Sequence, residues 1–248
     1  MVRVKYICTA LEKRMPASLA EDYDNVGLLA GSKENTVTRV LCALDLTEAV
    51  LDEAVCLGAE LIVTHHPILF FGRKNLIEDD PEGRLLARLI RERKSLVAMH
   101  TNYDAAGNGV NDALADAIGL TGVLPLESGV RLGQIRPTAL YAFADRIAEK
   151  LGGVVRRYGN PETIVSRIAV LGGAGGDYTA IARTAGADTF VTGEIGYHRA
   201  CAALDGGMCV LEAGHAATEK PAVHHMAGIL KSIGLDIEIT ESANEPFL

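Results

Sequence analysis

Short apolar runs alternate with amphipathic segments along most of this 248-residue chain, and this alternation constrains the fold more than any other feature. In the first half we predict strands at 39–45, 60–64 and 95–99. Each is followed by a predicted helix, at 47–57, 82–93 and 110–118. In the second half we predict strands at 167–171, 188–192, 208–212 and 235–240. The helices predicted between them lie at 177–185, 197–204 and 217–233. This order predicts an α/β protein with parallel sheets that are covered by helices.

The stretch from about 121 to 165 departs from this pattern. It contains three prolines, and we predict a strand at 138–142, a helix at 144–151 and a strand at 153–158. We interpret it as the connection between two α/β halves, with some strands of its own. The sequence therefore predicts a first domain at 1–125 and a second at 126–248, with an exchange of strands near the junction left open.

Charge and cysteine content exclude several classes of protein. The net charge is −8 and no Lys/Arg-rich run is present, which disfavours nucleic-acid binding. The five cysteines form no C-x-x-C pair and mostly lie in apolar runs, so we expect buried, reduced thiols. Glu12, Lys13 and Arg14 interrupt the first apolar stretch, and no apolar run approaches the roughly 20 residues that span a bilayer. We expect a cytoplasmic protein.

Side chains that bind metals follow several of the predicted strands. His65 and His66 come directly after the second strand of the first half, and Asp104 follows the third. His215 and Glu219 follow the third strand of the second half, and their spacing of four places both on one face of a helix start. Parallel strands end at one edge of a sheet, where α/β proteins build their sites. Two such sheets facing each other would bring all five side chains together.

Three imidazoles and two carboxylates are enough for one or two metal ions. The set suits divalent Zn, Fe, Mn or Co, and it contains no thiolate. Two ions that share Asp104 would leave positions for water, which loses its proton near neutral pH when a metal binds it. Each residue also has a simpler role open to it: His65 and His66 packed against loops, Asp104 in an Asx-turn, Glu219 as a solvated first-turn carboxylate. The five together favour a metal site.

Further candidates are less specific. Glu194 and His198 follow a predicted strand and are four residues apart, so we consider them as catalytic proton carriers or as support behind the ligands; alternatively, Glu194 caps the next helix. His100 is a possible ligand, but we favour a role in orienting Asp104. The loop Gly172–Gly176 could bind phosphate through backbone N–H groups, although a tight turn is the interpretation we favour.

Six segments in the same order resemble the NIF three-like family, whose members are also described as GTP cyclohydrolase I type 2 homologues. They are Tyr23–Leu28 (YDNVGL), Asp45–Glu48 (DLTE), Thr64–Pro67 (THHP), His100–Ala105 (HTNYDA), Thr192–Glu194 (TGE) and Gly214–Glu219 (GHAATE). The resemblance implies two similar α/β domains with a dinuclear metal site in the cleft between them. It assigns the ligands to the five residues above and implies a homohexamer.

Several functions are compatible with this site. We favour a metal-dependent hydrolase that acts on a small molecule, such as a nucleotide or another phosphorylated or cyclic amide compound. A genuine GTP cyclohydrolase, which the family name implies, is the first alternative. A non-catalytic metal-binding scaffold or metallochaperone is the second. The identity of the two divalent ions and of the substrate is left open by the sequence.

Overall fold

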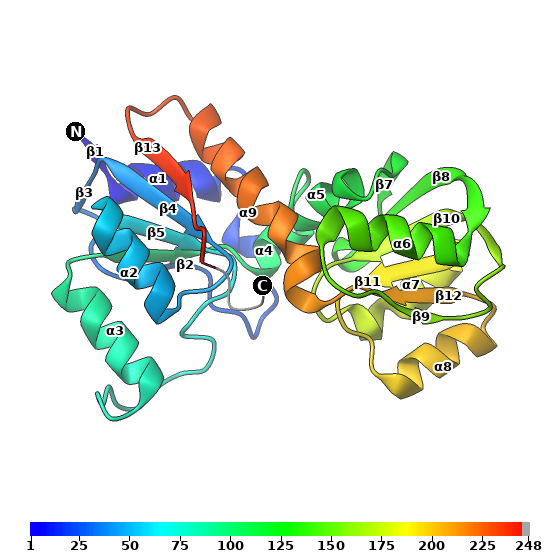
Figure 1. Cartoon of the computed structure of the whole chain (residues 1–248). Coiled ribbons are helices and arrows are strands. Elements are labelled where there is room, and N and C mark those ends of the chain that lie inside the picture. Colours follow the sequence, from blue (N-terminus) through cyan, green and yellow to red (C-terminus); the bar gives the residue numbers. More distant parts are fainter. Residues whose placement is uncertain (245–248) are drawn as a thin grey trace. The chain divides into compact units, whose positions relative to one another are not determined.

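The computed structural model describes residues 1–244, which form two compact units (Figure 1). Unit 1 contains Met1–Ala106 and the segment that begins at Val223, and unit 2 contains Gly107–Ala222. The chain therefore leaves unit 1 after Ala106 and returns to it within the residues of helix α9 (His215–Ser232).

Unit 1 is built around a five-stranded sheet with the strand order β13-β4-β5-β6-β2. The four strands from β13 to β6 are parallel, and β2 is antiparallel at the edge beside β6. The elements of unit 1 before α9 are β1 (Val2–Arg3), α1 (Val4–Glu12), the 3-10 helix η1 (Ala17–Leu19), β2 (Gly27–Ala30), β3 (Thr36–Val37), β4 (Arg39–Ala43), α2 (Glu48–Leu57), β5 (Leu61–Thr64), α3 (Pro81–Arg91), β6 (Ser95–Ala98) and α4 (Thr101–Ala105). After α9 comes β13 (Glu238–Glu241).

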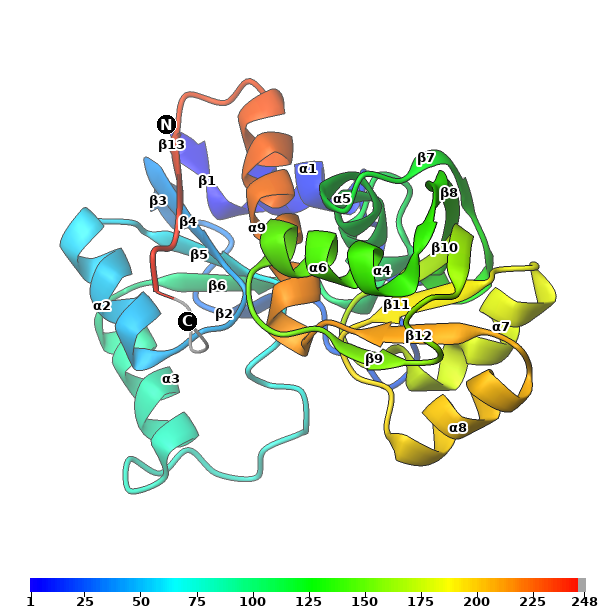
Figure 2. The ribbon, with the colours of Figure 1, turned by 45° about the vertical axis from the view of Figure 1, so that its right-hand side comes forward.

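Helices cover both faces of this sheet. In Figure 2, α2 and α3 lie on one side of the strands, and α1 and the C-terminal part of α9 lie on the other. Apolar residues of α2 and α3, such as Leu51 and Leu89, form one core cluster with Leu41, Ile62 and Leu96 of the sheet. These strands are buried on both faces, which explains their nearly continuous apolar sequences.

The helix boundaries of unit 1 follow local rules. Thr47 caps α2, because its hydroxyl accepts a hydrogen bond from the Val50 N–H at 3.2 Å, and Gly58 ends the helix in the left-handed conformation. Asp80 caps α3 in the same way and is followed by Pro81 at the first helical position. Both helices therefore begin and end within two residues of the bounds that the sequence predicted.

Unit 2 contains a six-stranded sheet with the order β7-β8-β10-β11-β12-β9. Strands β10, β11 and β12 are parallel, whereas β7, β8 and β9 add antiparallel pairs at the two sides. The elements that precede α9 are α5 (Val110–Ala117), β7 (Thr121–Pro125), η2 (Glu127–Gly129), β8 (Arg131–Ala139), α6 (Leu140–Leu151), β9 (Arg156–Tyr158), β10 (Ile164–Leu171), η3 (Gly175–Tyr178), α7 (Thr179–Thr184), β11 (Thr189–Thr192), α8 (Tyr197–Asp205) and β12 (Cys209–Glu212).

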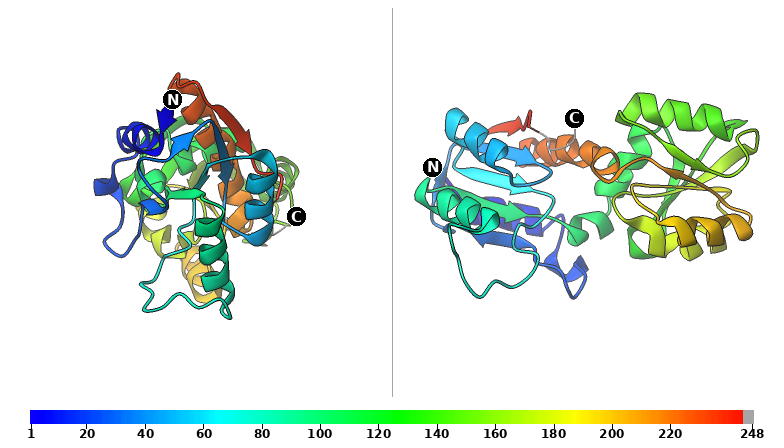
Figure 3. Two further views of the ribbon diagram at one scale, coloured as in Figure 1. Left: turned by 90° about the vertical axis from the view of Figure 1, so that its left-hand side faces the viewer. Right: turned by 60° about the horizontal axis from the view of Figure 1, so that its bottom comes forward.

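This sheet also has an apolar cluster on each face. Leu114 of α5 and Phe143 of α6 pack with Val170 on one face. Ala182 of α7 and Ala200 of α8 pack on the other, together with residues such as Leu171 and Phe190. The right-hand view of Figure 3 shows α6 and α8 on opposite sides of the strands. The mixed α/β architecture predicted from the sequence is confirmed, although parallel pairing in unit 2 is restricted to the central strands β10, β11 and β12.

The strand predicted at 138–142 is wrong. Strand β8 ends at Ala139 and α6 begins at Leu140, so the helix takes the residues that were expected to continue the strand. The buried positions Leu140, Phe143, Ala144 and Ile147 have helical spacing. Their pattern begins inside an apolar run that reads equally well as a strand.

The two units also differ from the predicted division at residues 125 and 126. Strand β13 pairs in parallel with β4, so the end of the chain belongs to unit 1. Helix α5 and strand β7, which precede residue 126, belong to unit 2, where β7 pairs with β8. Both differences arise from pairing between strands, which the composition of a segment does not reveal.

Two further expectations concern membranes and thiols. No helix within residues 1–244 is long and apolar enough to cross a membrane. All five cysteines are free, and Cys42 and Cys209 are buried, whereas Cys56 is exposed on α2. Burial raises the pKa of the Cys42 thiol to about 12, so this thiol stays protonated.

An ion pair between a buried arginine and a partly exposed aspartate fixes α5 to β8 in unit 2. The Arg131 guanidinium, which is 2% exposed, donates from Nε and Nη2 to the two carboxylate oxygens of Asp112 at 2.8 and 2.9 Å. Burial alone would raise the pKa of Asp112, but the bonds from Arg131 outweigh it and hold this pKa below its usual value. The pair thereby fixes helix α5, which also carries Asn111. The Asn111 side chain accepts a hydrogen bond from Gly172, in the loop after β10.

We predict that Asp112→Asn lowers the free energy of unfolding by about 3 kcal/mol at pH 7, because the buried Arg131 loses its charged partner. Asp116→Asn, an exposed change on the same helix, should cost less than about 0.5 kcal/mol. Since the pKa of Asp112 is lowered by folding, the wild-type advantage should be complete above about pH 4 and should shrink as the pH falls below that value. Urea unfolding from pH 7 to pH 3 measures this, and equal losses in the two variants would contradict it.

Candidate metal centre

Three parallel strands of unit 1 end side by side at one edge of the sheet. Ala43 of β4 is paired with Thr64 of β5, which is paired with Ala98 of β6. The ladder continues past the strand ends, because the His66 N–H donates to Leu44 O at 2.9 Å and the Met99 N–H donates to Thr64 O at 2.9 Å. The residues that follow the three strands are therefore held in register by backbone hydrogen bonds.

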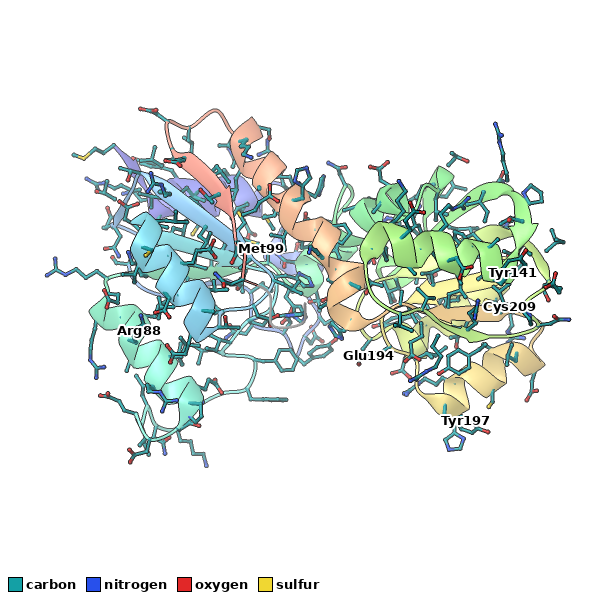
Figure 4. The ribbon with its side chains drawn as sticks, viewed as in Figure 1. Arg88, Met99, Tyr141, Glu194, Tyr197 and Cys209 are labelled. Atoms are coloured by element: carbon teal, nitrogen blue, oxygen red, sulfur yellow. The ribbon has the colours of Figure 1, made fainter. Side chains whose placement is uncertain are left out.

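Each histidine at this edge is oriented through its Nδ1 atom. His65 Nδ1 lies 2.8 Å from the carbonyl oxygen of Met99, the residue labelled after β6 in Figure 4. His66 Nδ1 lies 2.8 Å from Asp45 Oδ1, and His100 Nδ1 lies the same distance from Asp24 Oδ1. All three partners are oxygen acceptors, so the proton belongs on Nδ1 and the lone pair on Nε2. This tautomer is the one that metal-ligating histidines usually adopt.

The three imidazoles are close enough to share an ion. Their potential ligand atoms all lie within 4.8 Å of one another. His65 is 3% exposed, and its Nε2 is 3.8 Å from Asp104 Oδ1 on helix α4. Unit 1 therefore combines three nitrogen donors and one carboxylate, a mixture that suits Zn, Fe, Mn and Co.

His100 does not have the partner that the sequence predicted. Its side chain bonds Asp24, and its backbone oxygen accepts from the Asp104 N–H at 3.0 Å. The Asp24 carboxylate is fully buried and also accepts from Thr101 N–H at 3.0 Å and from the Thr101 hydroxyl. Although burial alone would raise the pKa of Asp24, these bonds hold it well below its usual range, so the group is a carboxylate at neutral pH.

Unit 2 places its two predicted ligands in the first turns of α9. His215 Nε2 is 3.3 Å from Glu219 Oε2, one helical turn further on. His215 Nδ1 is 3.3 Å from Oε1 of Glu194, which follows β11 and is labelled in Figure 4. Carboxylates therefore lie at both nitrogens of this ring, with Glu219 buried and Glu194 exposed.

The glycine loop after β10 packs directly against these ligands. A Cβ on Gly173, which has φ +62°, would lie 2.3 Å from Glu219 Oε1 and 3.2 Å from His215 Nε2. The Gly173 N–H donates to the Thr218 hydroxyl at 3.1 Å, and the Gly172 N–H donates to Asn111 Oδ1 at 2.8 Å. These N–H groups bond side chains of the protein, which accords with the tight turn favoured from the sequence and not with a phosphate loop.

A cavity of about 310 Å³ adjoins His215 within unit 2. Its lining includes Glu194, Arg156 and Glu212. Glu212 accepts hydrogen bonds from the Tyr158 hydroxyl at 2.9 Å and from Arg156 at 3.0 Å. Charged side chains thus line part of the cavity, whose volume lies at the low end of the usual size of small-molecule sites.

The two candidate proton carriers lie in different surroundings. Glu194 contacts His215, and it does not cap α8, whose N-cap is Gly196 with no side-chain hydrogen bond. His198 is exposed in the first turn of α8, where its ring lies 5.3 Å from that of Tyr197. The structure therefore connects Glu194, but not His198, to a predicted ligand.

Comparison with known proteins identifies the family. The sequence profile of Duf34/NIF3 (NGG1p interacting factor 3) matches residues 2–246. The chain belongs to this family. It is 32% identical over 259 residues to a protein named GTP cyclohydrolase 1 type 2 homolog from Clostridium perfringens, with 99% of each chain covered. A protein of the same name from Streptomyces coelicolor is 35% identical over 268 residues, with coverage of 100% of this chain and 94% of the relative.

Two solved structures share the fold. Staphylococcus aureus protein SA1388 is 28% identical, with a TM-score of 0.91 and coverage of 100% of this chain and 99% of that one. HcgD from Methanocaldococcus jannaschii is 26% identical, with a TM-score of 0.85 and 98% of each chain covered. The mixed α/β fold of this chain is therefore shared with both proteins.

Sequence reasoning missed two residues that support the site. Asp24 lies in the Tyr23–Leu28 segment, and nothing in that segment indicates its bond to His100, which is 76 positions away. Asn111 is fully buried and holds Gly172, yet it occupies an ordinary position on a predicted helix. Both act through contacts between distant parts of the chain, so no local pattern indicates them.

We predict that Gly173→Ala weakens zinc binding and lowers the free energy of unfolding by about 1–2 kcal/mol, because the new methyl group displaces the Glu219 carboxylate and φ is positive. The matched control is Gly172→Ala, where a Cβ would have no neighbour closer than 3.4 Å and φ is not positive. Zinc titration and urea unfolding of both variants provide the measurement. Equal zinc affinity in the two variants would show that the close approach of Gly173 has no role.

Proposed function

We propose that this protein binds two divalent metal ions and is a metal-dependent hydrolase of a small molecule. The proposed ligands are His65, His66, Asp104, His215 and Glu219. The observation that carries the proposal is the orientation of the histidines: His65 and His66 have an oxygen acceptor at Nδ1, and His215 has the Glu194 carboxylate there. This pattern is typical of imidazoles that bind a metal through Nε2.

The donor set also matches hydrolytic chemistry. Histidine and carboxylate ligands suit Zn, Fe and Mn, and such ions activate water and stabilise developing negative charge on oxygen. The cavity beside His215, whose lining includes Arg156, Glu194 and Glu212, supports a small substrate such as a nucleotide or another phosphorylated or cyclic amide compound. Glu194 is exposed and contacts His215, so we propose it for proton transfer, with His198 as a second candidate. A homohexamer in the cytoplasm stays a prediction.

The names of the relatives support a more specific alternative. Several are called GTP cyclohydrolase 1 type 2 homolog. Genuine GTP cyclohydrolase activity requires recognition of a purine and a triphosphate, and the glycine loop Gly172–Gly176 turns two of its N–H groups to protein side chains. Release of formate from GTP by the metal-loaded protein would establish this alternative over a hydrolase for another substrate.

We predict that His65→Ala and Glu219→Gln each lose at least one bound ion together with hydrolytic activity, because both remove a proposed ligand. His224→Ala is the matched control, since the His224 side chain is 83% exposed and pairs with Glu241. Elemental analysis after reconstitution with Zn, Fe or Mn should give about two ions per chain in the wild type and the control.

Two results would contradict the proposal. A wild type that takes up no metal under any of these conditions would leave a protein-binding scaffold as the better hypothesis. A variant that has lost its metal but keeps full activity on a screened substrate would show that the hydrolysis does not depend on the metal.

A further inference from the structure

A third histidine of unit 1 has the same arrangement as the two proposed ligands but no role in the proposed site. His100 is 18% exposed by its side chain, and its ring centroid lies 5.1 Å from that of His65 and 5.6 Å from that of His66. Its potential ligand atom is within 4.8 Å of theirs. Three imidazoles this close together are typical of a shared metal ion.

The Asp24 carboxylate determines which nitrogen His100 offers. It lies 2.8 Å from His100 Nδ1 and is held by two further hydrogen bonds from Thr101. This buried carboxylate accepts from both Thr101 donors, and as an acceptor toward the ring as well it keeps the His100 proton on Nδ1 and directs the lone pair to Nε2. A carboxylate behind an imidazole in this way also raises the basicity of a metal ligand.

The charges around the cluster favour a cation. Three carboxylates, those of Asp24, Asp45 and Asp104, contact the three imidazoles at 2.8, 2.8 and 3.8 Å. Three neutral histidines with a fourth donor nearby form the ligand set of a tetrahedral zinc site. All of these residues belong to unit 1, so the set is complete without His215 and Glu219.

We propose that His100 is a third imidazole ligand, positioned by Asp24, and that His65, His66 and His100 hold one divalent cation using residues of unit 1 alone. This rests on the proposed function only in that the protein binds metal. It goes beyond that proposal because one of the two ions would be retained when the ligands of unit 2 are removed.

The test uses the full chain and zinc or cobalt alone as the probe. His215→Ala combined with Glu219→Gln should retain about one ion per chain, with the cobalt absorption spectrum of a nitrogen-rich tetrahedral site. Adding His100→Asn should lower the affinity of that ion at least about tenfold. Asparagine can still donate to Asp24 from its amide nitrogen but lacks the atom that corresponds to Nε2. The matched control in the same background is His224→Asn, which should leave the affinity unchanged.

Each result bears on a different statement. The three-histidine site is wrong if the His100→Asn and His224→Asn variants bind zinc equally well. It is also wrong if the variant without His215 and Glu219 binds no ion while the wild type binds two. In both cases the proposed function stands. If the wild type binds none, the proposed function itself fails.

Asp24→Asn keeps every proposed ligand and should still weaken zinc binding by about tenfold or more. Its circular dichroism spectrum should be unchanged, which separates positioning of His100 from loss of the fold.

Discussion

The parallel pairing of β4, β5 and β6 is the constraint on which the chemistry of unit 1 depends. It brings the ends of three strands to one edge, and backbone hydrogen bonds beyond Thr64 keep the following residues in register. His65 and His66 consequently lie beside Met99 and His100 although more than 30 residues separate the two pairs. A shift of the β5–β6 register by one residue would exchange the faces to which these side chains point.

Hydrogen bonds at the Nδ1 atoms of three imidazoles convert this placement into a defined donor set. A carbonyl oxygen and two aspartates fix His65, His66 and His100 in this way. At His215, the Glu194 carboxylate lies 3.3 Å from Nδ1. Fixed rings lose less freedom when an ion binds, so the supporting residues contribute to affinity without touching the metal. In unit 2, residue 173 is a glycine, so the loop backbone can lie close to Glu219. The backbone then occupies space that water would fill beside a looser loop.

The sequence predicted what periodicity and strand ends determine, and it could not predict what distant pairing determines. Thr47 and Gly58 delimit α2 as their residue types indicate, and the five expected ligands do follow strands or begin a helix. The pairing of β13 with β4 was not foreseen, nor was the start of α6 inside an apolar run. The bond between Asp24 and His100 is of the same kind, because it joins positions 76 residues apart that have no common pattern.

The return of the chain to unit 1 has a consequence for its synthesis. Strand β13, which covers the outer side of β4, is the last strand of the described chain, and all strands of unit 2 precede it. At a translation rate of about 5–20 residues per second, the roughly 140 residues between β6 and β13 take on the order of ten seconds to appear. During that time a nascent sheet of β2, β4, β5 and β6 exposes the backbone groups along one side of β4, and such an edge readily pairs with another chain.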